Sequence, residues 1–307
     1  MNEIINKNKV NWVYVKLYVG KNIDRLDQLI VKVSRCVEQF EDVDQWFFIR
    51  YVDDQGVHLR LRLRSKIRDL EQFKNEIQQV CAPLVNALHE LLPSTYYPMV
   101  KPEGFEDSAV MGQELFGHKD VQIIFDEYEP EYDKYGGSAG IKAAEVLFQL
   151  SSELAKDILA DEIQGFYSRK DLVPLLMHEC CEVFIPQEKR QEFWKEYAFY
   201  WLGGNTPAAE DWREKFIEKW QQLREANVEL LTSQLDPRKQ SYIDRWRAGL
   251  REAAKRYHDI GDIADFSEEV LCFNFAHLMN NRLGIASLEE SYMATLLECK
   301  VDQAEVA

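Results

Sequence analysis

The stretch His58-Leu59-Arg60-Leu61-Arg62-Leu63-Arg64 alternates between basic and apolar residues. Successive side chains of a β-strand point to opposite faces of a sheet, so this alternation predicts a strand. One face would carry the leucines, which we expect to pack on a hydrophobic core. The other face would carry the histidine and the arginines in one row.

A second strand signal precedes this stretch. Trp46-Phe47-Phe48-Ile49-Arg50-Tyr51 is rich in aromatic and β-branched residues, which favour strands. Asp53-Asp54-Gln55-Gly56, between the two, has the composition of a tight turn. The sequence therefore predicts a β-hairpin with a leucine face and an arginine face.

The arginine face has two interpretations. A charged row is typical of a sheet surface in solvent, or of an edge strand that charge protects from further pairing. Alternatively, the arginines line a groove that holds carboxylates, because a guanidinium can bind a carboxylate through two parallel hydrogen bonds. The pattern alone leaves both interpretations open.

Length and composition narrow the class of protein. A chain of 307 residues is long enough for one large domain or two ordinary ones. Its 16 Phe, 14 Tyr and 7 Trp residues indicate a sizeable packed core. A formal net charge of -16 disfavours direct DNA binding and attachment to anionic membranes.

The cysteines show no CxxC spacing, which indicates a reduced, cytoplasmic protein. His178-Glu179-Cys180-Cys181 could suggest metal ligands, but a lone histidine on a helix is more often simply packed, so we expect no metal there. The polar start of the chain does not resemble a signal peptide. No apolar run reaches the length of a membrane span.

The first part of the chain predicts alternating strands and helices. Val10–Val19 has strand composition, and a helix with apolar positions from Leu26 to Phe40 follows it, with Asn22 as the expected N-cap. After the hairpin, 68–92 has helical spacing, with Pro83 expected to kink or break it. Val121–Tyr128 resembles another strand. This order is that of a ferredoxin-like α/β sandwich.

The second part predicts helices only. One opens near Ser138, and further helices are expected at Leu172–Phe184, Gln187–Leu202, Ala208–Leu235, Arg238–Ile260, Ser267–Leu283 and Leu288–Cys299. The fold class is therefore α+β, with a ferredoxin-like N-terminal half and a mostly helical C-terminal half. We expect residues 1–160 to form the sandwich and 161–307 to form a helical region packed on it, within one continuous catalytic domain.

His277 is the histidine of greatest interest. In a helix it shares a face with Asn281, and Arg282 lies close by. One interpretation is a core histidine that is hydrogen-bonded to a neighbour. The other is a proton donor or acceptor that faces the arginine strand.

Separated motifs, taken together, match one family. They are Trp46-Phe47-Phe48-Ile49-Arg50-Tyr51 with His58-Leu59-Arg60-Leu61-Arg62, then Tyr128-Glu129-Pro130-Glu131 with Lys134-Tyr135-Gly136-Gly137, then Ala276-His277-Leu278-Met279-Asn280-Asn281-Arg282-Leu283. In these motifs the chain resembles the C-terminal elimination domain of class I lantibiotic dehydratases, which also occurs alone in thiopeptide-type bacteriocin biosynthesis. The large N-terminal glutamylation domain of that family has no counterpart here, so we expect a stand-alone version.

The resemblance implies a reaction. In that family a partner esterifies Ser or Thr of a ribosomally made precursor peptide with glutamate from glutamyl-tRNA, and the elimination domain removes the glutamate to leave dehydroalanine or dehydrobutyrine. By motif match, Arg60, Arg62 and His277 are the expected catalytic residues. The expected substrate-binding residues are His58, Arg64, Lys134, Asn281 and Arg282. No cofactor is implied, and a separate glutamylating protein is the expected partner.

The chain departs from the family at two places. Lys134 stands where the family usually has arginine, and Ser151-Ser152 stands where it tends to have an Asp-Ser pair. Some stand-alone relatives instead form the central pyridine of thiopeptides by a formal [4+2] cycloaddition, which is one alternative function. A non-catalytic subunit that binds the precursor peptide is another. A homodimer is one option for the assembly.

Overall fold

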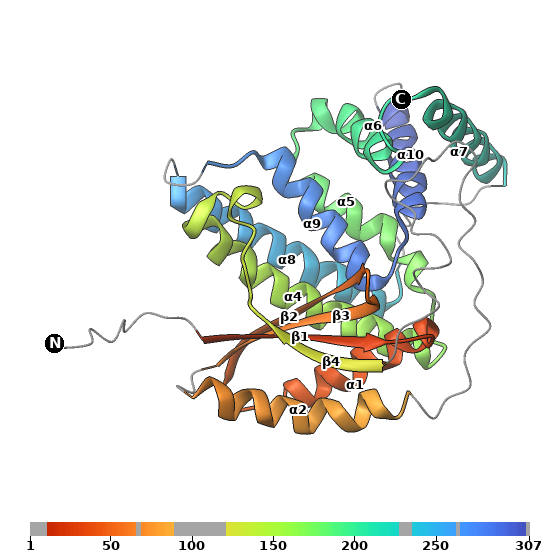
Figure 1. The fold of residues 1–307 in the computed structure, drawn as a ribbon. Helices are drawn as coiled ribbons and strands as arrows, with labels where there is room; N and C mark the ends of the chain where they lie inside the picture. The colour runs from red at the N-terminus through yellow and green to blue at the C-terminus, as the bar shows by residue number, and fades with distance from the viewer. Residues whose placement is uncertain (1–10, 66–68, 89–120, 227–234, 262–264, 305–307) are drawn as a thin grey trace. The chain divides into compact units, whose positions relative to one another are not determined.

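The computed structural model describes residues 11–65, 69–88, 121–226, 235–261 and 265–304. The chain divides into two compact units, shown with their elements in Figure 1. Of the described residues, 11–65, 69–88 and 121–130 belong to the first unit and the others to the second. Strands lie in the first unit and helices predominate in the second, which confirms the α+β class.

The first unit has the ferredoxin-like order of elements. In chain order these are β1 (Asn11–Val19), η1 (Ile23–Arg25), α1 (Leu26–Val37), β2 (Val43–Asp53), β3 (Gly56–Ser65), α2 (Leu70–Asn86) and β4 (Val121–Asp126). The sheet order is β2-β3-β1-β4, and every neighbouring pair is antiparallel. The arginine-bearing strand β3 is therefore an inner strand, and its interpretation as a protected edge strand is wrong.

The two faces of the sheet differ as the alternation predicts. Leu59, Leu61 and Leu63 are fully buried. Arg50 of β2 lies opposite Leu59 in the strand register, so both side chains point to the same face. Its Nη2 lies 2.6 Å from Oδ1 of Asp27 on α1, so the leucine face is the one that helices α1 and α2 of the same unit cover (Figure 1). Arg62 pairs with Tyr14 of β1, on the opposite face. The predicted leucine face and arginine face are thus confirmed.

Helix ends in the first unit differ in detail from the sequence prediction. Asn22 makes no capping bond through its side chain, and Nδ2 instead donates to the carbonyl of Leu88 at 3.0 Å. Asp69 caps α2 by accepting from the backbone N–H of Glu71 and Gln72. The helix continues through Pro83 and ends at Asn86, so the predicted break does not occur at Pro83 itself. Pro83 still removes one backbone N–H donor from the helix, which ends within one turn of it. The predicted continuation over 89–92 lies outside the described residues.

The second unit is built from helices that pack on one another. In chain order its elements are η2 (Tyr132–Lys134), α4 (Gly137–Ile163), η3 (Arg169–Asp171), α5 (Val173–Phe184), η4 (Gln187–Lys189), α6 (Arg190–Trp201), α7 (Pro207–Glu225), α8 (Pro237–Ile260), α9 (Glu268–Leu283) and α10 (Ser287–Ala304). The part of the predicted Ala208–Leu235 helix over 227–234 lies outside the described residues. The compact units meet in sequence after Pro130, and the predicted division at residue 160 falls inside α4. How the two parts pack stays a prediction.

Buried hydrogen bonds tie the helices of the second unit together. The indole N–H of Trp246 donates to the carbonyl of Leu176, which links α8 to α5. The hydroxyl of Tyr257 lies 2.9 Å from the carbonyl oxygen of Gly140, which fixes the start of α4 against α8. Within the described part of the chain, the helices are too short or too polar to cross a membrane.

Candidate active site

Arg62 lies among aromatic rings on the arginine face of the sheet. Its side chain is 9% exposed. The guanidinium carbon lies 4.7 Å from the ring centroid of Tyr14, 5.2 Å from that of Tyr128 and 5.5 Å from that of Phe47. Cation–π contacts of this kind restrict a guanidinium to one region while leaving its charge intact. The surrounding aromatic rings therefore hold the charged guanidinium of Arg62 in a fixed position.

Arg60 is held by a ring and a histidine. Its guanidinium carbon lies 3.2 Å from the ring centroid of Tyr51. Its Nε donates to Nε2 of His58 at 3.3 Å. These contacts use the face and the Nε of the guanidinium, and within the described residues no acceptor lies on either Nη. The two Nη nitrogens can therefore bind an anion.

His58 is a fully buried neutral histidine. Nδ1 lies 3.1 Å from the carbonyl oxygen of Gly56, which can only accept, so Nδ1 carries the proton. Nε2 accepts from Arg60 and therefore carries a lone pair. Burial lowers the pKa of His58, although the hydrogen bond to Gly56 and the charge of Asp53 oppose this shift. The buried His58 thus orients Arg60 through the hydrogen bond between Nε2 and the Arg60 Nε–H.

Arg64 differs from the other two arginines because it is already paired. Its Nε and Nη2 bind the two carboxylate oxygens of Asp44 at 2.7 and 3.2 Å. Both side chains are about one-third exposed. A substrate carboxylate would have to compete with Asp44 for Arg64, whereas within the described residues no carboxylate lies on the Nη nitrogens of Arg60.

His277 of α9 is oriented by a buried carboxylate. Its Nδ1 lies 3.0 and 3.3 Å from the two oxygens of Glu290 on α10. Glu290 is 1% exposed, whereas the His277 side chain is 29% exposed. A carboxylate that accepts from Nδ1 leaves the Nε2 lone pair free to take a proton. His277 is thus a half-buried histidine with a fixed tautomer, and it is hydrogen-bonded to a neighbour as the first interpretation expects. Its role as a proton acceptor stays a prediction.

Two further donors hold Glu290. The hydroxyl of Tyr197 on α6 donates at 2.5 Å and the side-chain amide of Asn280 at 3.2 Å, both to Oε2. Burial and the neighbouring Glu290 charge hold the pKa of Tyr197 well above its ordinary value, so the hydroxyl keeps its proton. Sequence reasoning missed Glu290 and Tyr197, because a glutamate in the first turn of a helix is ordinary.

The remaining predicted residues of the second unit lie in different surroundings. Arg282 is 1% exposed and donates from Nε to the hydroxyl of Ser152 at 3.0 Å. Lys134 is exposed, and its Nζ lies 2.5 Å from the carboxylate of Glu131. Asn281 is half-buried, four residues after His277 on α9.

The predicted catalytic residues belong to different units. Arg60 and Arg62 lie in the first unit and His277 lies in the second. Each unit by itself holds one half of the predicted site, an anion-binding face or a base. Their convergence on one substrate stays a prediction.

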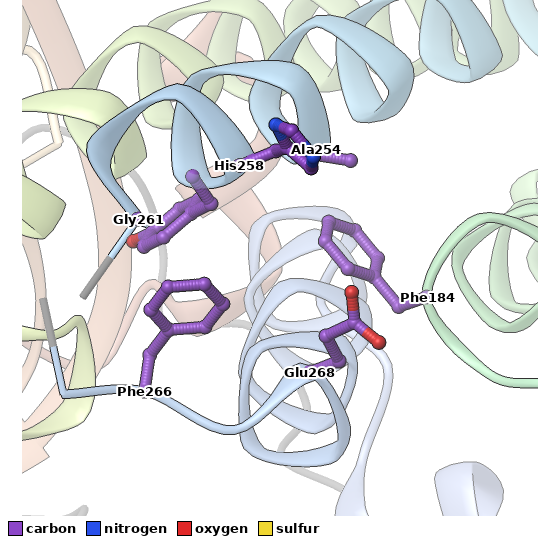
Figure 2. Close-up of a pocket in the computed structure, with 7 residues that line it drawn as sticks. Phe184, Ala254, His258, Gly261, Phe266 and Glu268 are labelled. Atoms are coloured by element: carbon purple, nitrogen blue, oxygen red, sulfur yellow. The ribbon is translucent and has the colours of Figure 1, made fainter.

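The second unit also has a cavity of about 410 Å³ that does not include His277. Phe184, Tyr257, Phe266 and Glu268 are among the residues that line it (Figure 2). This cavity therefore lies outside the candidate active site.

Comparison with known proteins shows the family of the chain. The family described as "Lantibiotic biosynthesis dehydratase C-term" matches residues 12–301. No curated protein matches the chain.

Three solved structures are similar in fold. The tRNA-dependent lantibiotic dehydratase MibB from Microbispora sp. 107891 is 20% identical with a TM-score of 0.64, and the match covers 100% of this chain but only 29% of MibB. The pyridine synthase TbtD from thiomuracin biosynthesis is 17% identical with a TM-score of 0.66, over 97% of this chain and 100% of TbtD. TsrL is 14% identical with a TM-score of 0.54, and the match covers 97% of this chain and 95% of TsrL. With the match over residues 12–301, the chain belongs to the family of lantibiotic biosynthesis dehydratase C-terminal domains.

Proposed function

We propose that this chain is a lyase that eliminates glutamate from glutamylated Ser or Thr of a ribosomally made precursor peptide. The products would be dehydroalanine or dehydrobutyrine. The observation that carries the proposal is the pairing of His277 with the buried Glu290, since elimination needs a base of defined tautomer. Family membership supports a role in the biosynthesis of such peptides.

The chemistry of the elimination suits this pair. Nε2 of His277 takes the proton from Cα, and the electron pair of that bond forms the Cα=Cβ double bond. The bond from Cβ to the ester oxygen breaks, and glutamate leaves as a carboxylate. The resulting imidazolium is stabilised by the Glu290 carboxylate at Nδ1, in the manner of the carboxylate in a catalytic triad.

The arginine face supplies the complementary charge. The leaving group carries carboxylates, and negative charge also develops on the peptide as the Cα proton departs. Arg60 and Arg62 lie adjacent on one face, and aromatic rings hold both guanidiniums in place. The burial of Arg62 strengthens its interaction with an anion. We assign them to the glutamate and the developing charge. Because Arg282 is buried against Ser152, we assign it to the internal structure of the second unit.

A second candidate function is pyridine formation. It is favoured by one observation, the match with the pyridine synthase TbtD over nearly the whole length of both chains. Elimination is the better supported of the two, because cycloaddition of two dehydroalanines releases no glutamate and gives Arg60 and Arg62 no carboxylates to bind. A subunit that only binds the precursor peptide would need no Glu290-oriented histidine.

The test is mass spectrometry of a precursor peptide made together with its glutamylating partner protein and this chain. Elimination predicts dehydrated peptide with the native chain, and glutamylated peptide that accumulates with His277→Ala or Arg62→Ala. Full dehydration in the absence of this chain, with a pyridine macrocycle only in its presence, would assign the second function. Leader binding that survives without any chemical change would assign the non-catalytic role.

A further inference from the structure

One exposed and two half-buried aromatic side chains lie beside His277 in the second unit. Tyr200, near the end of α6, is 62% exposed. Its ring centroid lies 4.9 Å from that of Trp201 and 4.8 Å from that of Phe273 on α9. Trp201 and Phe273 are themselves stacked at 5.9 Å with an angle of 17° between their planes. We call Tyr200, Trp201 and Phe273 the aromatic platform.

Folding alone does not account for the platform. An exposed tyrosine gains little from burial, and within the described residues the Tyr200 hydroxyl has no hydrogen-bond partner. Val270, which precedes Phe273 by three residues and so shares its face of α9, is 46% exposed. Contiguous exposed apolar groups of this kind mark binding surfaces in soluble proteins.

The platform adjoins the proposed base. The Trp201 ring centroid lies 4.4 Å from that of His277. Consecutive Cα atoms of a peptide are about 3.8 Å apart. When His277 reaches the Cα proton of one peptide residue, a neighbouring residue therefore lies within reach of the aromatic rings. This geometry identifies the occupant of the platform as the peptide itself.

We propose that the aromatic platform binds the side chain of a precursor-peptide residue that flanks the modified Ser or Thr, and that it selects apolar or aromatic side chains there. The proposal rests on the proposed function, because it places the reacting residue at His277. The platform carries no charge, so a flanking Asp or Lys gains nothing from it. Face and edge contacts with aromatic rings favour a flanking Phe, Leu or similar side chain.

The experiment compares two synthetic peptides that bind without reacting. Each carries an analogue of glutamylated Ser in which an amide replaces the ester, and the flanking residue is Phe in one and Gly in the other. Calorimetry on the full chain is expected to show about tenfold tighter binding of the Phe peptide, the order expected for burial of an aromatic side chain. In Tyr200→Ala the ratio of the two dissociation constants is expected to fall close to one. Phe166→Ala is the matched control, because Phe166 is 56% exposed but packs on Arg238 outside the platform.

Three results would overturn the proposal. They are equal binding of the two peptides, failure of both to bind, and a ratio that is unchanged in Tyr200→Ala. Loss of association with the glutamylating protein in Tyr200→Ala, with the peptide ratio intact, would assign the platform to that protein instead. Because the probes do not react, a preference that depends on Tyr200 would stand even if the chain failed to eliminate glutamate, so the two proposals can fail separately.

Discussion

Nδ1 of His277 lies 3.0 Å from Oε1 of Glu290, which is buried where α6, α9 and α10 meet. This contact fixes the tautomer of a partly exposed histidine and places a negative charge behind it. A base that must take a proton from carbon gains from both effects. In the proposed elimination, the second unit therefore supplies the base.

Glu290→Gln is expected to slow elimination by about 10²- to 10⁴-fold, the range expected for loss of an oriented acid–base group. The amide can donate to Nδ1 of His277, which favours the wrong tautomer and gives no charge stabilisation. The measurement is the single-turnover rate with glutamylated peptide. Glu289→Gln is the matched control, since Glu289 pairs with Lys170 at the surface, and it is expected to keep the native rate.

Arg62 is expected to act through its charge and its planar shape. Arg62→Ala should slow elimination by about 10²- to 10³-fold, and Arg62→Lys should fall between Ala and the native chain, because lysine keeps the charge but not the planar fork. The same rate assay measures both variants. Arg50→Lys, on the helix-covered face beside Asp27, is the control. Native rates in Arg62→Ala would remove Arg62 from the mechanism.

The alternation in β3 was enough to predict the hairpin, because a period of two leaves a strand only one way to bury its leucines. The same pattern could not show that β3 is an inner strand, since strand order depends on pairing with β1, which is distant in sequence. Likewise, the sequence indicated His277 but not Glu290. The two residues lie on different helices, and only tertiary packing brings a carboxylate to Nδ1.

His58 illustrates another limit of sequence reasoning. It shares the arginine face, so a role in substrate binding was the natural prediction, and the alternation could not show that it is fully buried. The rings of Tyr18 and Tyr51, from two other strands, lie 4.4 and 5.6 Å from it. Burial of a residue at alternating spacing depends on such neighbours, which no local pattern contains.

His58 is expected to position Arg60 in its neutral form. Gln can accept from Arg60 and donate to the Gly56 carbonyl, so His58→Gln should keep more activity than His58→Ala. We expect a difference of about tenfold in kcat/KM, the order expected for a hydrogen bond to a charged group. Equal loss in both variants would show that the hydrogen bond to Arg60 does not matter.

The stability of the chain should fall as the pH drops below about 6.5, the ordinary histidine pKa. Burial lowers the pKa of His58 and of His178 in the folded chain, so the unfolded chain binds more protons below that pH. Denaturant unfolding at a series of pH values between about 7 and 5 measures the free energy of unfolding. This free energy should fall less with pH in His58→Gln than in the native chain.

Gly140→Ala is expected to destabilise the second unit by about 1–3 kcal/mol through overpacking. A Cβ at this position would lie 1.7 Å from the carbonyl oxygen of Tyr135, so the start of α4 would have to shift. Thermal unfolding measures the effect. Ser138→Ala, at an exposed neighbouring position, is the control and should leave the midpoint unchanged.

The most direct test of the central claim is the rate at which the purified chain releases glutamate from a synthetic peptide with one glutamylated serine. We predict release of glutamate with formation of dehydroalanine, and strong slowing by either Arg62→Ala or His277→Ala. If the peptide stays glutamylated with the native chain, while a peptide with two dehydroalanines is converted to a pyridine product, the proposed elimination is contradicted.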